Sequence, residues 1–269
     1  MTSILCLGNF GGITDGQKQV AKLMIHLYRK YKYKFIIGLG NNILPEGVKS
    51  VNDKKFNENF EEPYKQLLKD LKFYNILGDI DYITRKSLNS QINYGTINKR
   101  WVLPNNFYCF KKVINKTTIE FIVIDTNLDK IKNKKTQEIW ALNTLLESRS
   151  RWNILVSHHP WYSRSNKNNC DSELDLLYTK LNNTNKLDLI VSGHDTSQQH
   201  IYIPNKPNMI ISGVGCMSGK MPVLELYNEL KFFSNELGCL MIEFNKNKLN
   251  ISFYNVNKIK IHNFSIVKY

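Results

Sequence analysis

Short apolar runs alternate with amphipathic segments through the first third of the chain. Runs rich in strand-forming residues predict β-strands at 3–7, 34–39 and 73–77. Between the first two, apolar residues recur at three- and four-residue intervals, which predicts a helix over 16–31. A second helical stretch is expected over 63–71. Strands that alternate with helices in this way predict an α/β layered core.

The remainder of the chain is richer in strands. Apolar runs and alternating patterns predict strands at 107–114, 118–125, 154–156, 187–191, 199–203, 209–213, 238–245, 249–255 and 258–268. Amphipathic helices are expected at 136–150 and 171–181. Because no repeat, linker or low-complexity tail interrupts the pattern, we expect one domain over residues 1–269.

Composition supports a folded core and adds little about partners. Hydrophobic residues make up 42% of the 269 residues, and the formal net charge is +14. Such a charge favours anionic partners, but the lysines are spread along the whole chain and the densest run, 132–135, is short. We therefore expect no nucleic-acid partner.

Five cysteines at irregular spacing are expected to be reduced and mostly core residues. No stretch approaches the ~18 apolar residues of a membrane span, so no transmembrane segment is expected. No signal peptide is visible at the N-terminus, which favours a cytoplasmic location for the chain as it stands and a secretory one if a leader is missing.

Two predicted strands end in histidines. The run 154–156 leads into Ser157-His158-His159-Pro160, and the run 187–191 leads into Ser192-Gly193-His194-Asp195. Ligands and metals collect beyond the carboxyl ends of strands in open α/β sheets. His158 and His194 could therefore share a metal ion.

The strand-end turns carry a family resemblance. They read Gly8-Asn9, Gly40-Asn41-Asn42, Gly78-Asp79-Ile80-Asp81, Ser157-His158-His159-Pro160 and Gly193-His194-Asp195-Thr196. Their order and spacing resemble the metallophosphoesterases (calcineurin-like phosphoesterases), and most closely the purple, or tartrate-resistant, acid phosphatases. The corresponding family turns read Gly-Asp, Gly-Asp-Asn, Gly-Asn-His-Asp, Gly-His and Gly-His-x-His. Further segments that look like this family lie at 47–56, 99–104, 121–126 and 211–215.

The resemblance implies an α/β fold in which two mixed β-sheets are sandwiched between helices, in four layers. It also implies two metal ions about 3.5–4 Å apart at the strand ends, where they polarise a phosphate and activate water. One ion of the family is held by two Asp, a Tyr and a His, and the matching positions here are Asn9, Asn41, Leu44 and Thr196. Because no anionic ligand remains among them, this half of the site is expected to be vestigial and no dinuclear centre is expected.

The ligands of the other ion are better preserved. The matching positions are Asn41, Asp79, His158 and His194. Two imidazoles, one carboxylate and one amide oxygen suit a single divalent ion such as Zn, Fe or Mn. Two interpretations of Asp79 remain open, a metal ligand or a drifted residue in a dead site.

The resemblance also implies damage to the chemistry. The family histidine that contacts the phosphate is Ile80 here, and Asp81, which would steer that histidine, is expected to have lost its partner. Lys167 is the nearest match to a further substrate histidine and could bind an anion. His159 is expected to be a packing or pocket-wall residue. The remaining histidines, His26, His200 and His262, are expected to be helix or strand residues without chemistry.

These losses predict a pseudophosphatase, a scaffold or binding module with little or no phosphatase activity and an unknown protein partner. A functional parallel is the apicomplexan glideosome-associated protein, which resembles the same family with eroded metal ligands and anchors a motility motor. The alternative is a metal-dependent phosphomonoesterase that uses the one remaining metal site.

Overall fold

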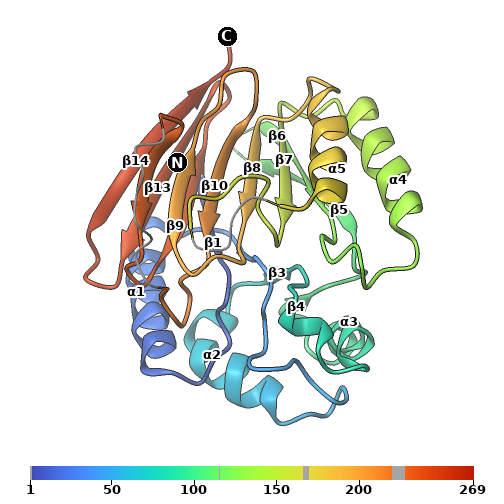
Figure 1. Cartoon of the computed structure of the whole chain (residues 1–269). Helices are drawn as coiled ribbons and strands as arrows, with labels where there is room; N and C mark the ends of the chain where they lie inside the picture. Colours follow the sequence, from blue (N-terminus) through green and yellow to red (C-terminus); the bar gives the residue numbers. More distant parts are fainter. Residues whose placement is uncertain (1, 115, 166–169, 220–227) are drawn as a thin grey trace.

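Two seven-stranded mixed sheets lie face to face in the computed structural model, which describes residues 2–114, 116–165, 170–219 and 228–269 (Figure 1). The first sheet has the order β14-β13-β12-β1-β2-β3-β4. Its strands are β1 Thr2–Leu7, β2 Ile36–Gly38, β3 Phe73–Asn75, β4 Trp101–Val102, β12 Gly238–Phe244, β13 Lys248–Asn255 and β14 Lys260–Val267.

The second sheet has the order β11-β9-β10-β8-β7-β6-β5. Its strands are β5 Tyr108–Ile114, β6 Thr117–Val123, β7 Trp152–Ser157, β8 Leu189–Ser192, β9 Gln198–Ile201, β10 Asn208–Ser212 and β11 Leu230–Ser234. The sheet sandwich expected from the sequence is therefore confirmed.

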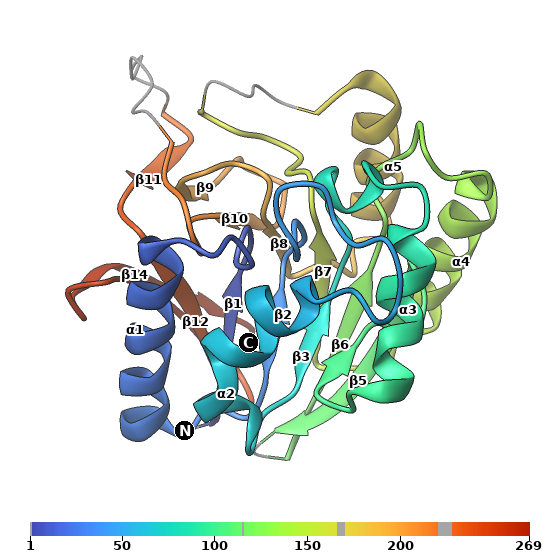
Figure 2. The same ribbon diagram turned by 90° about the horizontal axis from the view of Figure 1, so that it is seen from below.

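Helices cover both outer faces of the sandwich. The helices are α1 Asp15–Tyr31, α2 Glu62–Leu68, α3 Ser87–Ile97, α4 Lys134–Glu147 and α5 Ser172–Asn182, with short helical turns at Asn57–Glu61 and Ile80–Tyr82. Figure 2 shows α1 and α5 on opposite sides of the molecule with the strands between them. Thr14 caps α1, because its hydroxyl accepts a hydrogen bond from the backbone N–H of Gln17 at 3.0 Å.

The core is divided by the second sheet. Along β7, Ile154 and Val156 pack into the large cluster between the sheets, whereas Leu155 packs into a smaller cluster beneath α4 and α5. This alternation follows from the two-residue period of a strand. Because both faces of β7 are buried, its sequence is a continuous apolar run rather than an alternating one.

Parallel pairing brings the strand ends together. Strands β1 to β4 are parallel to one another, and β6, β7, β8 and β10 form a second parallel set. Backbone hydrogen bonds connect the turns that follow: Asn9 donates to Gly40 at 3.0 Å, and Gly193 donates to His158 at 3.0 Å. The turns singled out in the sequence therefore meet in one place.

Candidate metal centre

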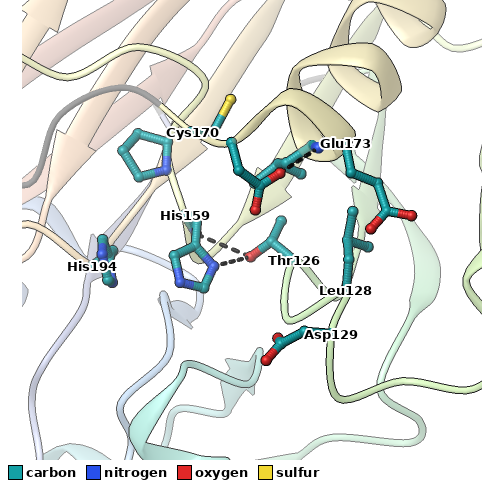
Figure 3. A pocket seen from close by; sticks show the side chains of 10 residues that line it. Thr126, Leu128, Asp129, His159, Cys170, Glu173 and His194 are labelled. Atoms are coloured by element: carbon teal, nitrogen blue, oxygen red, sulfur yellow. Dashed lines mark hydrogen bonds between the residues drawn. The ribbon is translucent and has the colours of Figure 1, made fainter.

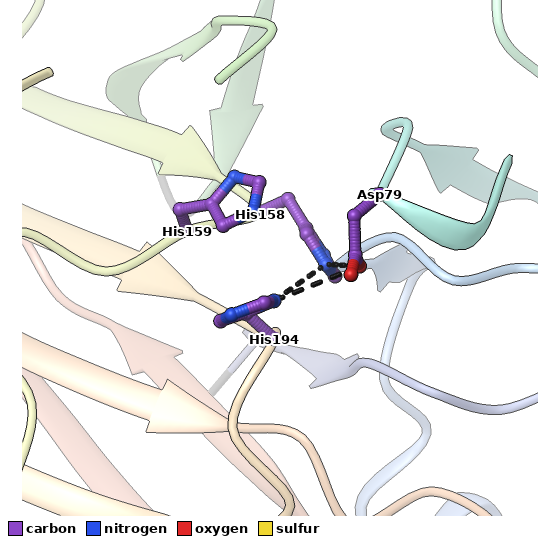
Figure 4. Close-up of side chains that lie close together, drawn as sticks. All are labelled: Asp79, His158, His159 and His194. Carbon is purple, nitrogen blue, oxygen red and sulfur yellow. Dashed lines mark hydrogen bonds and ion pairs between the residues drawn. The ribbon is translucent and has the colours of Figure 1, made fainter. Parts of the chain in front are cut away.

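Four side chains from three strand-end turns converge on one point (Figure 4). Asp79 follows β3, His158 and His159 follow β7, and His194 follows β8. One ligand atom from each lies within 4.8 Å of the others. Their ligand atoms are close enough together to hold one metal ion.

The spacing of three of these atoms fits a coordination sphere. Asp79 Oδ1 lies 2.9 Å from His158 Nε2 and 3.6 Å from His194 Nδ1, and the two nitrogens are 3.3 Å apart. Two ligand atoms of a tetrahedral ion with bonds of about 2.1 Å lie about 3.4 Å apart. The three atoms are thus spaced as ligands of one small cation would be.

The hydrogen bond made by one ring nitrogen of His158 orients its other nitrogen toward Asp79. Its Nδ1 lies 2.7 Å from the carbonyl oxygen of Leu39, which can only accept a hydrogen bond, so Nδ1 carries the proton. In the neutral ring Nε2 is then a bare lone pair, and it faces the Asp79 carboxylate at 2.9 Å. Two acceptors at that distance repel unless a proton or a metal ion lies between them. A backbone carbonyl that orients a metal-binding imidazole is a common outer-shell partner.

Asp79 is held as an anion. Partial burial alone raises its pKa, but the hydrogen bonds and charges of His158 and His194 outweigh that effect and hold the pKa well below its usual range. Its side chain is 44% exposed, whereas that of His158 is fully buried. The centre therefore presents one accessible negative charge beside two imidazoles.

The side-chain amides of Asn9 and Asn41 form hydrogen bonds with the backbone. Asn9 donates from Nδ2 to the carbonyl of Gly213 at 2.7 Å, and Asn41 Oδ1 accepts from the backbone N–H of Ile80 at 3.0 Å. Both residues have positive φ, 51° for Asn9 and 54° for Asn41, a conformation that Asn tolerates better than most residues. Both amides therefore stabilise the turns in which the family carries carboxylates.

The other two altered positions supply no charge. Leu44 is 6% exposed and offers only a hydrocarbon side chain. The backbone carbonyl of Thr196 accepts a hydrogen bond from Gly219 at 2.8 Å, and its side chain is a neutral hydroxyl. Lys167, the expected anion-binding residue, lies outside the described residues.

The histidine that would partner Asp81 is replaced by Ile80, and Asp81 binds other groups instead. Its fully buried carboxylate accepts hydrogen bonds from the backbone N–H of Gly78 at 2.9 Å, from that of Asn42 at 3.1 Å and from Gln91 Nε2 at 2.9 Å. Burial raises the pKa of Asp81 in spite of these bonds. Asp81 thus connects the turn after β3 to the turn after β2 and to α3.

His159 contributes more than the sequence indicated. Its Nδ1 lies 2.8 Å from Thr126 Oγ1, and its ring centroid is 4.3 Å from that of His194. It lines a cavity, as expected for a pocket-wall residue, but it also belongs to the four-residue centre, which was not predicted. The consecutive histidines in the sequence were the available signal, whereas the role of Thr126 left no local one.

A cavity of about 230 Å³ adjoins the centre (Figure 3). His159 and His194 form part of its wall. Three carboxylates, Asp129, Asp171 and Glu173, also line it, and no Lys or Arg does so among the lining residues that the structure describes. Two of these carboxylates are paired with lysines: Asp129 with Lys130 and Glu173 with Lys134, each at 2.6 Å.

Comparisons with known proteins point to one family. A family model described as calcineurin-like phosphoesterase matches residues 4–198. Purple acid phosphatase 4 of Arabidopsis thaliana is 26% identical over 295 residues, which cover 99% of this chain and 84% of that protein. Tartrate-resistant acid phosphatase type 5 of Homo sapiens is 25% identical over 236 residues, 78% of this chain and 72% of that protein.

Solved structures share the fold. GAP50, described as the anchor in the inner membrane complex of Plasmodium, superposes with a TM-score of 0.88 at 24% identity and covers 100% of this chain and 89% of that chain. Purple acid phosphatase PPD1 from yellow lupin seeds superposes with a TM-score of 0.76 at 12% identity, over 99% of this chain and 53% of that chain. In the described part of the molecule, no helix combines the length and the apolar character needed to cross a membrane.

Proposed function

The chain belongs to the calcineurin-like phosphoesterase family, and within that family we propose that it is a pseudophosphatase: a scaffold or binding module that holds at most one metal ion and has little or no phosphatase activity. The observation that carries this proposal is the loss of charge at the strand-end turns. Asn9 and Asn41 stand where the family has carboxylates, and both amides are engaged in backbone hydrogen bonds.

Charge balance argues against a pair of ions. Two divalent cations bring four positive charges into a partly buried crevice. Among the metal-ligand positions that match the family, Asp79 is the one carboxylate. Hard cations need anionic oxygens to offset the cost of losing water, and imidazoles alone do not supply them.

The charge that remains at the site is sufficient for a single ion. We propose that Asp79, His158 and His194 hold a single Zn, Fe or Mn ion, with the amide of Asn41 beside them. Such an ion would supply Lewis acidity when bound. The surrounding residues offer little support for phosphate hydrolysis at such an ion. Ile80 can neither bind phosphate nor transfer a proton. The adjoining cavity is lined by three carboxylates, Asp129, Asp171 and Glu173.

A role in binding fits these features. GAP50, which shares the fold, is described as an anchor, and that role offers a precedent for a non-catalytic use of this fold. We propose an unidentified protein partner for this chain on the same basis. If the chain is instead an enzyme, its substrate would be a phosphomonoester, and the single metal site would catalyse the hydrolysis.

Hydrolysis of a chromogenic phosphomonoester separates the two functions. The assay covers acidic to neutral pH, with Zn, Mn or Fe(II) added, and compares the native chain with His194→Ala. We expect both proteins to show the same background rate while the native chain keeps its fold by circular dichroism. Metal-dependent turnover that disappears in His194→Ala would contradict the pseudophosphatase and establish the single-metal hydrolase.

A further inference from the structure

The opposite edge of the sheets carries a concentration of positive charge. Lys34 lies two residues before β2, Lys72 directly precedes β3, and Arg100 directly precedes β4. The backbone N–H of Ile36 donates to the carbonyl of Lys72 at 3.0 Å, and that of Phe73 donates to the carbonyl of Arg100 at 2.8 Å. Because these strands are parallel and in register, their amino ends place the three cationic residues side by side.

These residues line a cleft of about 440 Å³ with Lys112, which reaches it from β5 of the second sheet. Asp70 is the one carboxylate that lines the cleft in the portion of the chain described by the structure. Within that portion, none of the four cations forms an ion pair with a carboxylate. Four neighbouring cations with one carboxylate repel one another, and an anion in the cleft would relieve that repulsion.

Two of the cations are already held in place. Lys112 Nζ donates to the hydroxyl of Tyr74 at 2.7 Å and lies 4.9 Å from the centroid of that ring and 5.7 Å from that of Phe35. Arg100 donates one N–H to the carbonyl of Lys69, which leaves four of its five N–H groups for other acceptors. Side chains that are ordered before a ligand arrives lose less conformational entropy when it binds.

We propose that this cleft binds a phosphate-bearing anion with two or more negative charges, at the end of the sheets opposite to the metal centre. Its volume lies within the usual range of small-molecule sites and exceeds what one inorganic phosphate fills, so it has room for a diphosphate or a phosphorylated small molecule. Guanidinium and ammonium groups are the donors that phosphate oxygens prefer. The cleft does not depend on the metal centre or on the proposed function.

Calorimetric titration with inorganic pyrophosphate tests the cleft. The full chain is used at low ionic strength with a chelator present, so that the metal centre does not contribute. We expect saturable binding that Lys34→Gln/Lys72→Gln weakens at least about tenfold, because two charge-assisted contacts are lost. Both side chains are exposed, so this variant keeps the fold. Lys132→Gln/Lys248→Gln removes the same charge from exposed positions outside the cleft and is expected to bind as the native chain does.

A second arm distinguishes a soluble phosphate from a lipid headgroup. The same three proteins are sedimented with vesicles of phosphatidylserine and phosphatidylcholine in equal parts. If only Lys34→Gln/Lys72→Gln binds pyrophosphate more weakly, the result supports a soluble ligand. If only that variant binds the vesicles more weakly, the result supports a lipid headgroup. Absence of binding in both arms, or equal binding by the two double variants, would overturn the proposal.

Discussion

Two clusters of histidines in this chain look alike by distance and differ in surroundings. His158 Nε2 and His194 Nδ1 lie 3.3 Å apart, and His200 Nδ1 and His262 Nε2 lie 3.1 Å apart. The first pair faces the carboxylate of Asp79 and adjoins a cavity. The second pair joins β9 of one sheet to β14 of the other.

Aromatic rings enclose the second pair. His200 stacks on Phe264 with centroids 3.6 Å apart, and His262 stacks on Phe232 at 4.5 Å. The remaining nitrogen of His200 lies 2.9 Å from Asn208 Oδ1, a neutral partner. Burial lowers the pKa of His200 to about 4, with smaller contributions from neighbouring His262 and Lys231. Close imidazoles thus form a candidate cation site only where a carboxylate and solvent access accompany them.

Removing the carboxylate from the first cluster should have the largest effect. Asp79→Asn leaves the fold intact, because its side chain is 44% exposed, and deletes the one formal negative charge of the centre. We expect zinc affinity to fall by about 100-fold or more, measured by competition with a chromogenic chelator. The matched control is His262→Gln, which alters the second cluster and should leave zinc affinity unchanged. Equal affinity in all three proteins would remove Asp79 from the ligand set.

Acid should destabilise the protein through the second cluster. The pKa of His200 is about 4 in the folded chain and about 6.5 when unfolded, so the unfolded state binds a proton first as pH falls. The stability that the neutral ring contributes is complete above pH 6.5 and is lost as pH falls through about 4. We expect this to cost about 2 kcal/mol after allowance for solvent screening.

Urea unfolding at pH 7 and at pH 4 measures that cost. His200→Phe keeps a ring that can stack on Phe264 and cannot titrate, so its free energy of unfolding should fall less between the two pH values. Parallel losses in the native chain and the variant would show that His200 does not titrate as described.

Strengthening the first cluster is the reverse test. Asn41→Asp restores a carboxylate beside Asp79, at a φ of 54° that Asp tolerates, and its oxygen can still accept from the N–H of Ile80. We expect zinc affinity to rise about tenfold because a second anionic oxygen joins the ligands. Unchanged affinity, measured with the same chelator, would mean that this oxygen does not reach the ion.

Giving the second cluster a carboxylate should have the smallest effect. Asn208→Asp places an anion against His200 Nε2 and should raise the pKa of that ring by about one unit. Histidine NMR titration follows the shift directly. No upward movement would show that desolvation, rather than the missing carboxylate, sets the pKa of this pair.

The sequence predicted those parts of the fold that have a local signal. Apolar runs located β1, β12 and β13 to within a residue or two, and turn sequences placed Asp79, His158 and His194 on one edge. Helix α3 was not predicted, because Ser87–Ile97 has no apolar periodicity. It is stabilised instead by buried polar contacts such as the hydrogen bond from Gln91 to Asp81.

The other features that the sequence did not predict depend on contacts between residues that are distant in the sequence. The partners of Asp81 come from three separate turns and helices, and Thr126 reaches His159 across 33 residues of sequence. Neither contact has a local pattern. The same holds for the basic cleft, since Lys34, Lys72 and Arg100 look scattered in sequence and become neighbours only through strand register.

The metal content of the native chain tests the central claim most directly. Protein purified without chelator and loaded with excess zinc is desalted and analysed by inductively coupled plasma mass spectrometry. We predict one ion per chain, and close to none in His158→Ala. Two ions per native chain would contradict a single-metal centre, and so would metal content that is the same in both proteins.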